Sequence, residues 1–280
     1  MAAAKNHPIP IRRRLRRAAK VGTGRVRTLI KQALARSGYQ IIRLPTDSTL
    51  AAAWDGSLDR TIQPWGVDPC FRAIWEQIAS RTMVDETRCF MLYQLARHVA
   101  SLPGDAAEVG VYKGGTARLI ALTLPATSVH LFDTFAGMPS VDPAKDPFSR
   151  TGDLDDATVE MVEQYLAGCD NTHIYPGLFP ETAGAVARAS FCFVHVDVVI
   201  YRSVLDCCRF FYDRLVPGGV LLFDDYGFEL AAGARSAVDE FFADKPERPI
   251  YLPTGQCIVL RGSPPVPADT VPVQAREVAV

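Results

Sequence analysis

Three aspartates lie at the ends of two apolar runs that have the composition of buried strands. Asp197 lies near the end of the run Phe191–Val198, and Asp224 and Asp225 directly follow the run Val220–Phe223. The carboxyl ends of neighbouring parallel strands meet at one edge of a sheet, so we expect these acids to lie close together. Three carboxylates in one place repel one another unless a cation lies between them, and oxygen ligands favour Mg²⁺, Ca²⁺ or Mn²⁺ over zinc. The sequence therefore predicts a divalent-metal site, with helix caps and surface turns as the alternative explanation of the acids.

A histidine lies two positions before the first of these acids. In an extended strand, His195 and Asp197 point to the same face of the sheet. His195 is therefore a candidate general base beside the metal. The alternative is a core histidine whose hydrogen bonds are satisfied within the fold.

A glycine-rich turn follows an earlier apolar run. Residues 108–116 read E-V-G-V-Y-K-G-G-T, which is neither the G-x-G-x-x-G of dinucleotide-binding folds nor a P-loop. Such a turn lets a ligand approach the backbone closely, and Glu108 ahead of it indicates a ligand with a cationic end. Asp133, 25 positions after Glu108, ends the next expected strand, where a ribose would contact a carboxylate. Together these features predict a nucleoside-containing ligand; a purely structural turn and a capping role for Asp133 are the alternatives.

The elements that must position these residues alternate between strand and helix patterns. Upstream of them, Cys70–Leu102 has a helical pattern. We expect strands at Asp105–Val111, Ser128–Asp133, His173–Tyr175, Phe191–Val198, Val220–Phe223, Pro249–Leu252 and Gln256–Leu260, and helices at Gly115–Leu124, Asp156–Ala167, Ser203–Leu215 and Ala231–Ala243. This alternation is typical of an α/β fold with a doubly wound, mostly parallel sheet that is covered by helices on both faces.

Composition narrows the class of protein. The chain has 280 residues, 48% of them hydrophobic, enough for one large domain or two small ones. Its seven cysteines are an odd number without a C-x-x-C pair, which indicates reduced thiols rather than a disulfide framework or a zinc site. Its apolar runs fall short of the roughly 20 residues of a membrane helix, and the basic start lacks the apolar stretch of a secretory signal. We expect a cytoplasmic protein.

The charge is distributed unevenly along the chain. Residues 1–43 contain 12 of the 30 lysines and arginines and no acid, whereas the remainder carries 18 basic against 31 acidic residues. A solvated tail is one interpretation of this arm. Another is that residues 5–43 contact an acidic partner or an anionic membrane surface. Membrane contact would place the protein at the inner face of the cell membrane. Nucleic-acid binding is disfavoured because no aromatic residues are interleaved with the basic ones, and an organellar transit peptide because serine is scarce.

With these features the chain resembles a known group of enzymes, the class I S-adenosylmethionine-dependent methyltransferases. Within this group it resembles the macrocin O-methyltransferase family, whose members methylate sugar hydroxyls. The matching stretches cover about residues 80–260 in the family's order: E-V-G-V-Y-K-G-G-T, D-T-F-A-G-M-P, Y-P-G-L-F-P-E-T, V-H-V-D-V-V-I-Y-R-S, L-V-P-G-G-V-L-L-F-D-D-Y-G and A-R-S-A-V-D-E-F-F. The resemblance implies a Rossmann-like, seven-stranded methyltransferase fold with an N-terminal helical extension. The expected organisation is a basic, partly helical arm (1–53), a connector with lead-in helices (54–104), the methyltransferase domain (105–262) and a disordered tail (263–280).

The resemblance also implies roles for individual residues. S-adenosylmethionine would contact Glu108, Gly110, Tyr112, Gly114, Gly115, Thr116, Asp133, Thr134 and Phe135, with Asp133 at the ribose. Asp197, Asp224 and Asp225 would bind Mg²⁺ or another divalent cation that holds two vicinal oxygens of the acceptor, with Asp197 and His195 as catalytic residues. Gly177, Leu178 and Phe179 would lie toward the methyl-transfer side or the adenine edge, and Met138–Asp156 would form a mobile lid.

One position departs from the family pattern. Relatives usually have a second acid two residues after the first, in D-x-D-[LI]-Y, whereas this chain has Val199. A carboxylate there could serve as base or metal ligand, and valine can do neither. We therefore expect a metal-dependent O-methyltransferase acting on a hydroxyl of a sugar or glycan, from a natural product or a lipid-linked or polysaccharide glycan. The open alternatives are a catechol-type phenolic O-methyltransferase, a weakened or inactive cofactor-binding protein and, less favoured, an RNA methyltransferase; homo-oligomer formation is also left open.

Overall fold

The fold is built on a mostly parallel sheet. The computed structural model describes residues 63–262, and within them the strands follow the order β3-β2-β1-β4-β5-β7-β6. The strands are β1 (Asp105–Val109), β2 (Val129–Asp133), β3 (Thr172–Pro176), β4 (Phe191–Val196), β5 (Leu215–Phe223), β6 (Ile250–Tyr251) and β7 (Cys257–Leu260). The predicted seven-stranded, doubly wound α/β fold is confirmed.

The pairing of the strands decides where a ligand can bind. β1 pairs in parallel with β2 on one side and β4 on the other, and β4 pairs in parallel with β5. β7 is antiparallel to both β5 and β6. The strand order therefore reverses between β1 and β4, where the chain has returned from β3 to the middle of the sheet. Ligands of open α/β sheets bind outside the carboxyl ends of the strands at such a point.

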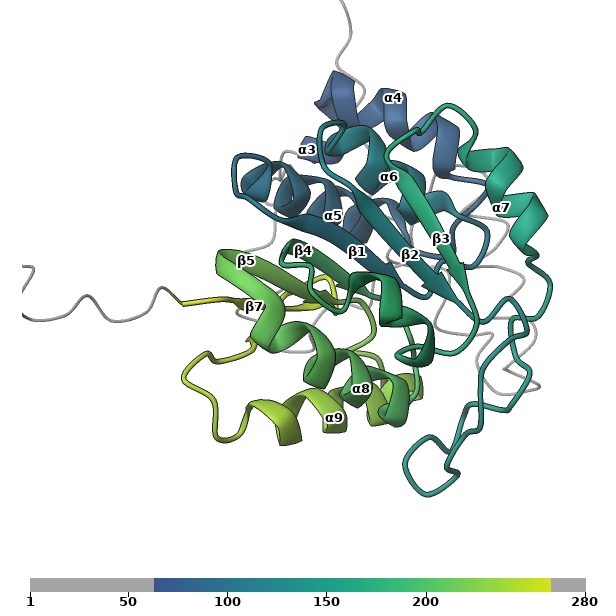
Figure 1. The fold of residues 1–280 in the computed structure, drawn as a ribbon, viewed down its shortest axis with the longest axis vertical. Helices are drawn as coiled ribbons and strands as arrows, with labels where there is room; N and C mark the ends of the chain where they lie inside the picture. The colour runs from purple at the N-terminus through teal and green to yellow at the C-terminus, as the bar shows by residue number, and fades with distance from the viewer. Residues whose placement is uncertain (1–62, 263–280) are drawn as a thin grey trace, which may run out of the picture. The chain divides into compact units, whose positions relative to one another are not determined.

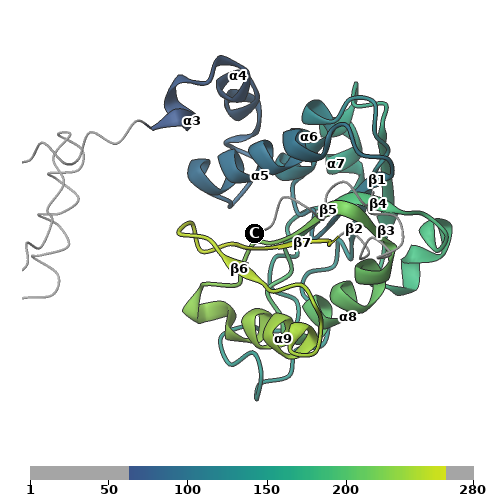
Figure 2. The ribbon, with the colours of Figure 1, turned by 90° about the vertical axis from the view of Figure 1, so that its left-hand side faces the viewer.

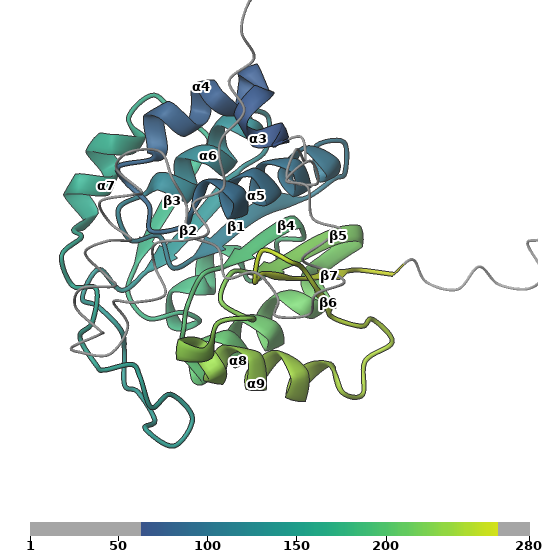
Figure 3. The same ribbon diagram turned by 180° about the vertical axis from the view of Figure 1, so that it is seen from behind.

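Helices cover both faces of the sheet (Figure 1). They are α3 (Pro64–Val67), α4 (Pro69–Ile78), α5 (Glu86–Val99), α6 (Gly115–Thr123), α7 (Val159–Leu166), α8 (Tyr201–Phe211) and α9 (Ala232–Phe242), with the 3₁₀ turns η1 (Glu181–Val186), η2 (Tyr212–Arg214) and η3 (Glu229–Ala231). Figure 2 and Figure 3 show α4, α5 and α6 on one face and α8 and α9 on the other. Each face has its own core of buried apolar side chains.

Burial explains why the central strands read as continuous apolar runs. Every residue of β4 is buried, as are the last five residues of β5. A parallel strand with helices on both faces has no solvent-exposed side, so it does not alternate between apolar and polar residues. A carboxylate can therefore follow such a strand only where the sheet ends, which is the situation of Asp197, Asp224 and Asp225.

The structure refines several predicted boundaries. The helical region predicted at Cys70–Leu102 is two helices, α4 and α5, because Asp85 accepts hydrogen bonds from the backbone amides of Thr87 and Arg88 and so starts a new helix. Side chains of both helices belong to the same core as those of α6 and the sheet. The predicted arm (1–53), residues 54–62 of the predicted connector and the predicted tail from residue 263 lie outside the described residues.

Two expectations from composition can be compared with the structure. All seven cysteines are free; Cys70 is exposed and the other six are buried. Within residues 63–262, no helix combines the length and apolar character needed to cross a membrane.

Candidate functional site

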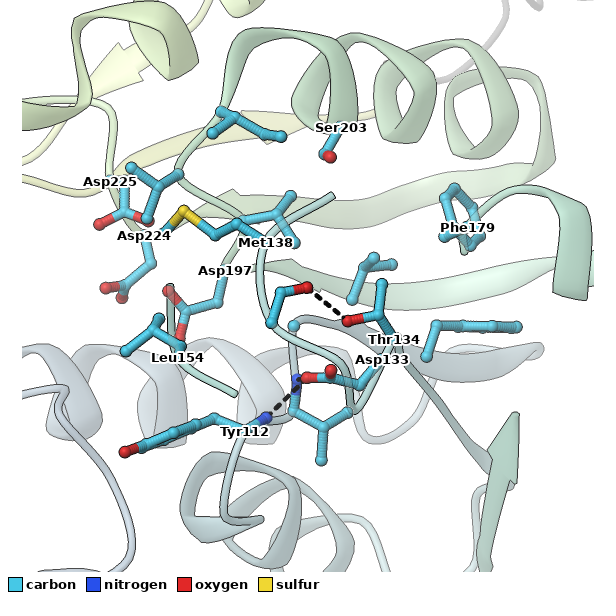
Figure 4. A pocket seen from close by; sticks show the side chains of 18 of the residues that line it. Tyr112, Asp133, Thr134, Met138, Leu154, Phe179, Asp197, Ser203, Asp224 and Asp225 are labelled. Carbon is cyan, nitrogen blue, oxygen red and sulfur yellow. Dashed lines mark hydrogen bonds between the residues drawn. The ribbon is translucent and has the colours of Figure 1, made fainter. Parts of the chain in front are cut away.

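A pocket lies at the carboxyl ends of β1, β2, β4 and β5, beside the point where the strand order reverses (Figure 4). The glycine-rich turn, the end of β2 and the three predicted metal ligands all contribute to its lining. The lead-in segment contributes too, through Arg81, Thr82, Met83, Val84 and Arg88. The sequence-predicted strand ends thus meet in one place.

The glycine-rich turn brings the ends of β1 and β4 into close contact. Gly110 has φ +91°, and a Cβ on it would lie 2.0 Å from the carbonyl oxygen of Asp197. Only glycine fits this position, both sterically and conformationally. Gly110, Tyr112 and Thr116 line the pocket.

The other two glycines of the turn serve a different purpose. The Cβ position of Gly114 faces Tyr165 and Val162, and that of Gly115 lies 2.8 Å from backbone atoms of Arg81. Neither is among the pocket-lining residues. Gly114 and Gly115 therefore allow helix α6 to pack closely against its neighbours, and their predicted contact with a cofactor remains a prediction.

Asp133 organises the turn. Its Oδ2 accepts hydrogen bonds from the backbone amides of Val111 (2.7 Å) and Tyr112 (2.8 Å), and its Oδ1 accepts one from the amide of Phe135 (2.8 Å). The carboxylate lines the pocket, as does Thr134, whereas the ring of Phe135 packs against the core. Sequence reasoning located Asp133 correctly at the pocket, and its contact with a ribose stays a prediction.

Behind the pocket, His195 and Glu108 form a fully buried pair. Nδ1 of His195 lies 2.8 Å from Oε1 of Glu108, and its Nε2 lies 3.6 Å from Oδ1 of Asp224. Burial by itself lowers the pKa of His195, but Asp224 and Glu108 outweigh it and raise the pKa to about 10. Burial raises the pKa of Glu108, and the hydrogen bond with His195 opposes that rise.

This arrangement corrects one prediction. A general base must contact the proton that it takes up, and the side chain of His195 is fully buried and absent from the pocket lining. His195 is therefore wrongly placed to act as a base on an acceptor; it is an internal link between β1, β4 and the acid cluster. Glu108 is also absent from the lining, and its Oε2 has no hydrogen-bond partner among the described residues.

The three predicted metal ligands do come together. Asp197, Asp224 and Asp225 each place one carboxylate oxygen within 4.8 Å of the others. Burial, followed by the charges of Asp224 and Asp225, raises the pKa of Asp197 well above its usual value; burial and Asp224 raise the pKa of Asp225 to about 7. Oδ2 of Asp225 is buried without a hydrogen-bond partner among the described residues. Crowded, desolvated carboxylates with a free oxygen are a donor set that fits a divalent cation.

Sequence reasoning missed the cation inside this cluster. Nη1 of Arg88 pairs with Oδ2 of Asp224, while its Nε donates to Asp85 at 2.8 Å. Gln256 donates from Nε2 to Oδ1 of Asp224 at 2.8 Å. Both oxygens of Asp224 are thus engaged by protein groups. The sequence around Arg88 does not indicate this pairing, because Asp224 lies 136 positions further along the chain.

Apolar side chains also line the pocket. Val198, Val199, Ile200, Met138, Pro139 and Leu154 line it, and Figure 4 shows Met138 and Leu154 beside the acids. Strand β4 ends at Val196, so strand alternation does not decide where Val199 points. Val199 nevertheless lines the pocket, as do Gly177, Leu178 and Phe179. The position at which the resemblance led us to expect a second acid is therefore part of the site.

Comparison with known proteins gives consistent matches. The family model of macrocin-O-methyltransferase (TylF) matches residues 71–251. The 8-demethyl-8-(2,3-dimethoxy-alpha-L-rhamnosyl)-tetracenomycin-C 4'-O-methyltransferase of Streptomyces olivaceus is 28% identical over 184 residues, which are 60% of this chain and 69% of that protein. The mycinamicin III 3''-O-methyltransferase of Micromonospora griseorubida is 28% identical over 157 residues, 50% of this chain and 61% of that protein. Among solved structures, the O-methyltransferase NovP aligns with a TM-score of 0.59 at 25% identity, over 65% of this chain and 83% of NovP.

Proposed function

Because the chain belongs to the macrocin O-methyltransferase family and is an S-adenosylmethionine-dependent O-methyltransferase, we propose that it methylates a hydroxyl of a sugar or glycan with the help of a divalent cation. The names of the relatives support the acceptor class, since one acts on a rhamnosyl-bearing tetracenomycin. The metal is supported by the chain's own residues. The observation that carries the proposal is the acid cluster of Asp197, Asp224 and Asp225 in the same pocket as the glycine-rich turn.

Each part of the pocket has a role in this proposal. Gly110 and Tyr112 would hold the cofactor against the backbone of the turn, which Asp133 keeps in shape. Asp197 and Asp225 would hold the cation, Mg²⁺ in the first instance, while Asp224 is kept in position by Arg88 and Gln256. A bound divalent cation lowers the pKa of a coordinated hydroxyl and fixes its direction relative to the methyl donor. The apolar lining residues would exclude water from the acceptor.

The test separates cofactor binding from metal-assisted transfer. Asp197→Ala should abolish methyl transfer to sugar acceptors while cofactor binding, measured by calorimetry, persists. Asp155→Ala, which removes an exposed acid of the neighbouring loop, is the matched control and should behave like the wild type. Wild-type turnover in Asp197→Ala, or undiminished turnover in EDTA, would refute the metal assignment. Parallel assays with phenolic diols distinguish a sugar methyltransferase from a catechol-type enzyme.

A second candidate function follows from Val199. The pocket offers an apolar side chain at the position where the resemblance led us to expect an acid, which favours a cofactor-binding protein with weak or no transfer activity. Cofactor binding without methyl transfer to any saccharide fraction would support this second candidate.

We also propose, from charge alone, that residues 5–43 contact an anionic membrane surface. These residues carry 12 positive charges and no negative one, and they lie outside the described part of the chain. Co-sedimentation with phosphatidylserine vesicles, lost on deletion of residues 1–43 and reduced by salt, is the expected result. Binding that is equal to neutral and anionic vesicles would refute it.

A further inference from the structure

The segment Met138–Asp156, here called the lid segment, runs from the pocket to helix α8 and back. Its two ends are paired: the amide of Met138 donates to the carbonyl of Asp153 at 2.8 Å, and that of Gly152 to the carbonyl of Met138 at 2.9 Å. Met138 and Leu154, at these paired ends, lie next to Asp197 and Asp224 in Figure 4. The position of the lid segment thus decides what covers the acids.

One side chain of the lid segment is buried although its neighbours are exposed. Asp146 is 4% exposed, whereas Lys145 and Phe148 are open to solvent. Its Oδ1 accepts a hydrogen bond from the backbone amide of Tyr201 at 3.0 Å. Tyr201 is the first residue of α8, and the residue before it, Ile200, has no side chain able to cap the helix. A carboxylate from 55 positions earlier therefore satisfies an amide at the positive end of α8.

A glycine in helix α9 makes room for this carboxylate. A Cβ on Gly233 would lie 1.8 Å from Oδ1 of Asp146 and 3.1 Å from the carbonyl oxygen of Lys145. No larger residue fits while Asp146 is in place. Beside it, Nζ of Lys145 lies 4.2 Å from the ring centroid of Tyr201, a cation–π contact. Tyr201 and Gly233 together form what we call the socket of Asp146.

We propose that Asp146 is a positioning residue that docks the lid segment in this socket and thereby holds Met138 and Leu154 over the acceptor. The proposal rests on the proposed function only in taking the acceptor to lie at the acid cluster. The same hydrogen bond also orders Val199 and Ile200, two further lining residues of the pocket, because they directly precede the amide that Asp146 accepts from. Release of Asp146 from the socket would therefore loosen Met138 and Leu154 as well as Val199 and Ile200, and leave the cofactor turn at Gly110 untouched.

Two variants remove the docking in independent ways. Asp146→Ala removes the carboxylate. Gly233→Ala leaves Asp146 intact but fills the socket, although alanine within a helix is by itself stabilising relative to glycine. Asp146→Asn keeps an oxygen of the same geometry and should restore most of the docking, and Asp155→Ala on the same segment is the neutral control.

Docking can be measured without acceptor or metal. The Arg150–Thr151 bond is the tryptic probe, because substitution of Asp146 would itself change cleavage after Lys145. We expect cleavage after Arg150 and amide exchange at Tyr201 to rise about tenfold or more in Asp146→Ala and Gly233→Ala, with exchange in β4 unchanged as evidence of an intact fold. Unchanged cleavage and exchange in both variants would overturn the proposal.

The effect on catalysis tests the positioning role. In both docking variants we expect KM for the acceptor to rise at least about fivefold and turnover to fall, while the affinity for S-adenosylmethionine stays within about twofold. A lid segment that opens while acceptor KM and turnover stay unchanged would overturn the positioning role. Failure of the wild type to methylate any sugar would refute the proposed function instead, since the cleavage and exchange measurements need no acceptor.

Discussion

Arg88, on helix α5, pairs through Nη1 with Oδ2 of Asp224, which follows strand β5, so the acid cluster contains a cation that belongs to the protein. The side chain of Arg88 is 13% exposed and that of Asp224 is fully buried. The guanidinium offsets part of the repulsion among three carboxylates that would otherwise have to be neutralised by protons or metal. The lead-in helix is thereby part of the site and not only a cover for the sheet.

Removing this internal cation should change metal affinity. Arg88→Met leaves the three carboxylates with only the buried His195 as a protein counter-charge, so we expect the Kd for Mn²⁺, measured by calorimetry, to fall several-fold. The metal-free variant should lose stability, because breaking a buried ion pair by removing one partner costs about 3–5 kcal/mol. Arg88→Lys keeps the charge and should lie between Arg88→Met and the wild type. Unchanged Mn²⁺ affinity in Arg88→Met would show that the guanidinium does not act on the metal site.

The close approach at Gly110 can be separated from its backbone conformation. Gly110→Ala places a Cβ 2.0 Å from the carbonyl oxygen of Asp197, so β1 and β4 must move apart at the pocket. Gly168→Ala is the matched control, because Gly168 also has φ +91° but nothing lies within 4 Å of its Cβ position. We expect both variants to lose some stability, and only Gly110→Ala to lose cofactor affinity, by about tenfold or more, ~1.4 kcal/mol. Equal cofactor affinity in both variants would contradict the steric argument.

The metal-free protein should become less stable as the pH rises. The folded pKa of Asp225, about 7, lies above its ordinary 3.8, and that of His195, about 10, lies above its ordinary 6.5. Both groups therefore bind more protons in the folded state than in the unfolded state, which gives the unfolding free energy a negative slope with pH. The contribution of Asp225 is lost between about pH 4 and 7, and that of His195 between about pH 6.5 and 10.

Urea unfolding in EDTA at pH 5, 7 and 9 measures this dependence. Asp225→Asn should reduce the change between pH 5 and 7 and leave a fall from pH 7 to 9, to which His195 contributes. The raised pKa of Asp197 adds to the loss of stability with rising pH in both proteins. Saturating Mn²⁺ should raise stability most at the higher pH values, because protons then no longer compete for the carboxylates. An unfolding free energy of the wild type that increases from pH 5 to 7 would contradict the pKa assignment for Asp225.

Restoring a carboxylate at position 199 tests how far the valine limits activity. Val199→Asp adds a fourth acid to the pocket wall, so we expect tighter Mn²⁺ binding and a turnover at least about tenfold higher, equivalent to ~1.4 kcal/mol of barrier. Val199→Asn has the same shape without the charge and should remain at the level of the wild type. Turnover that is unchanged or lower in Val199→Asp, with intact cofactor binding, would show that the chain does not need an acid there.

The fold class and the location of most of the site follow from local patterns in the sequence. Apolar runs with the spacing of strands, glycine at the β1 turn and acids at strand ends are local patterns, and parallel pairing carries strand ends to one edge of the sheet. The sequence therefore suffices to indicate the metal-ligand candidates Asp197, Asp224 and Asp225, and Asp133 at the pocket. Helix boundaries were less well predicted where a cap such as Asp85 interrupts a continuous helical pattern.

Contacts between side chains that lie far apart in the chain cannot be predicted from such patterns and become visible only in the folded protein. Strand alternation predicted that His195 and Asp197 share a face of the sheet. It could not show that Glu108, on the neighbouring strand, forms a buried hydrogen bond with His195. Arg88 reaches Asp224 over 136 positions, and Asp146 reaches Tyr201 over 55. Such contacts depend on how helices and loops pack on the sheet. The sequence around each partner does not indicate this packing, because a hydrogen bond constrains positions in space and not spacing along the chain.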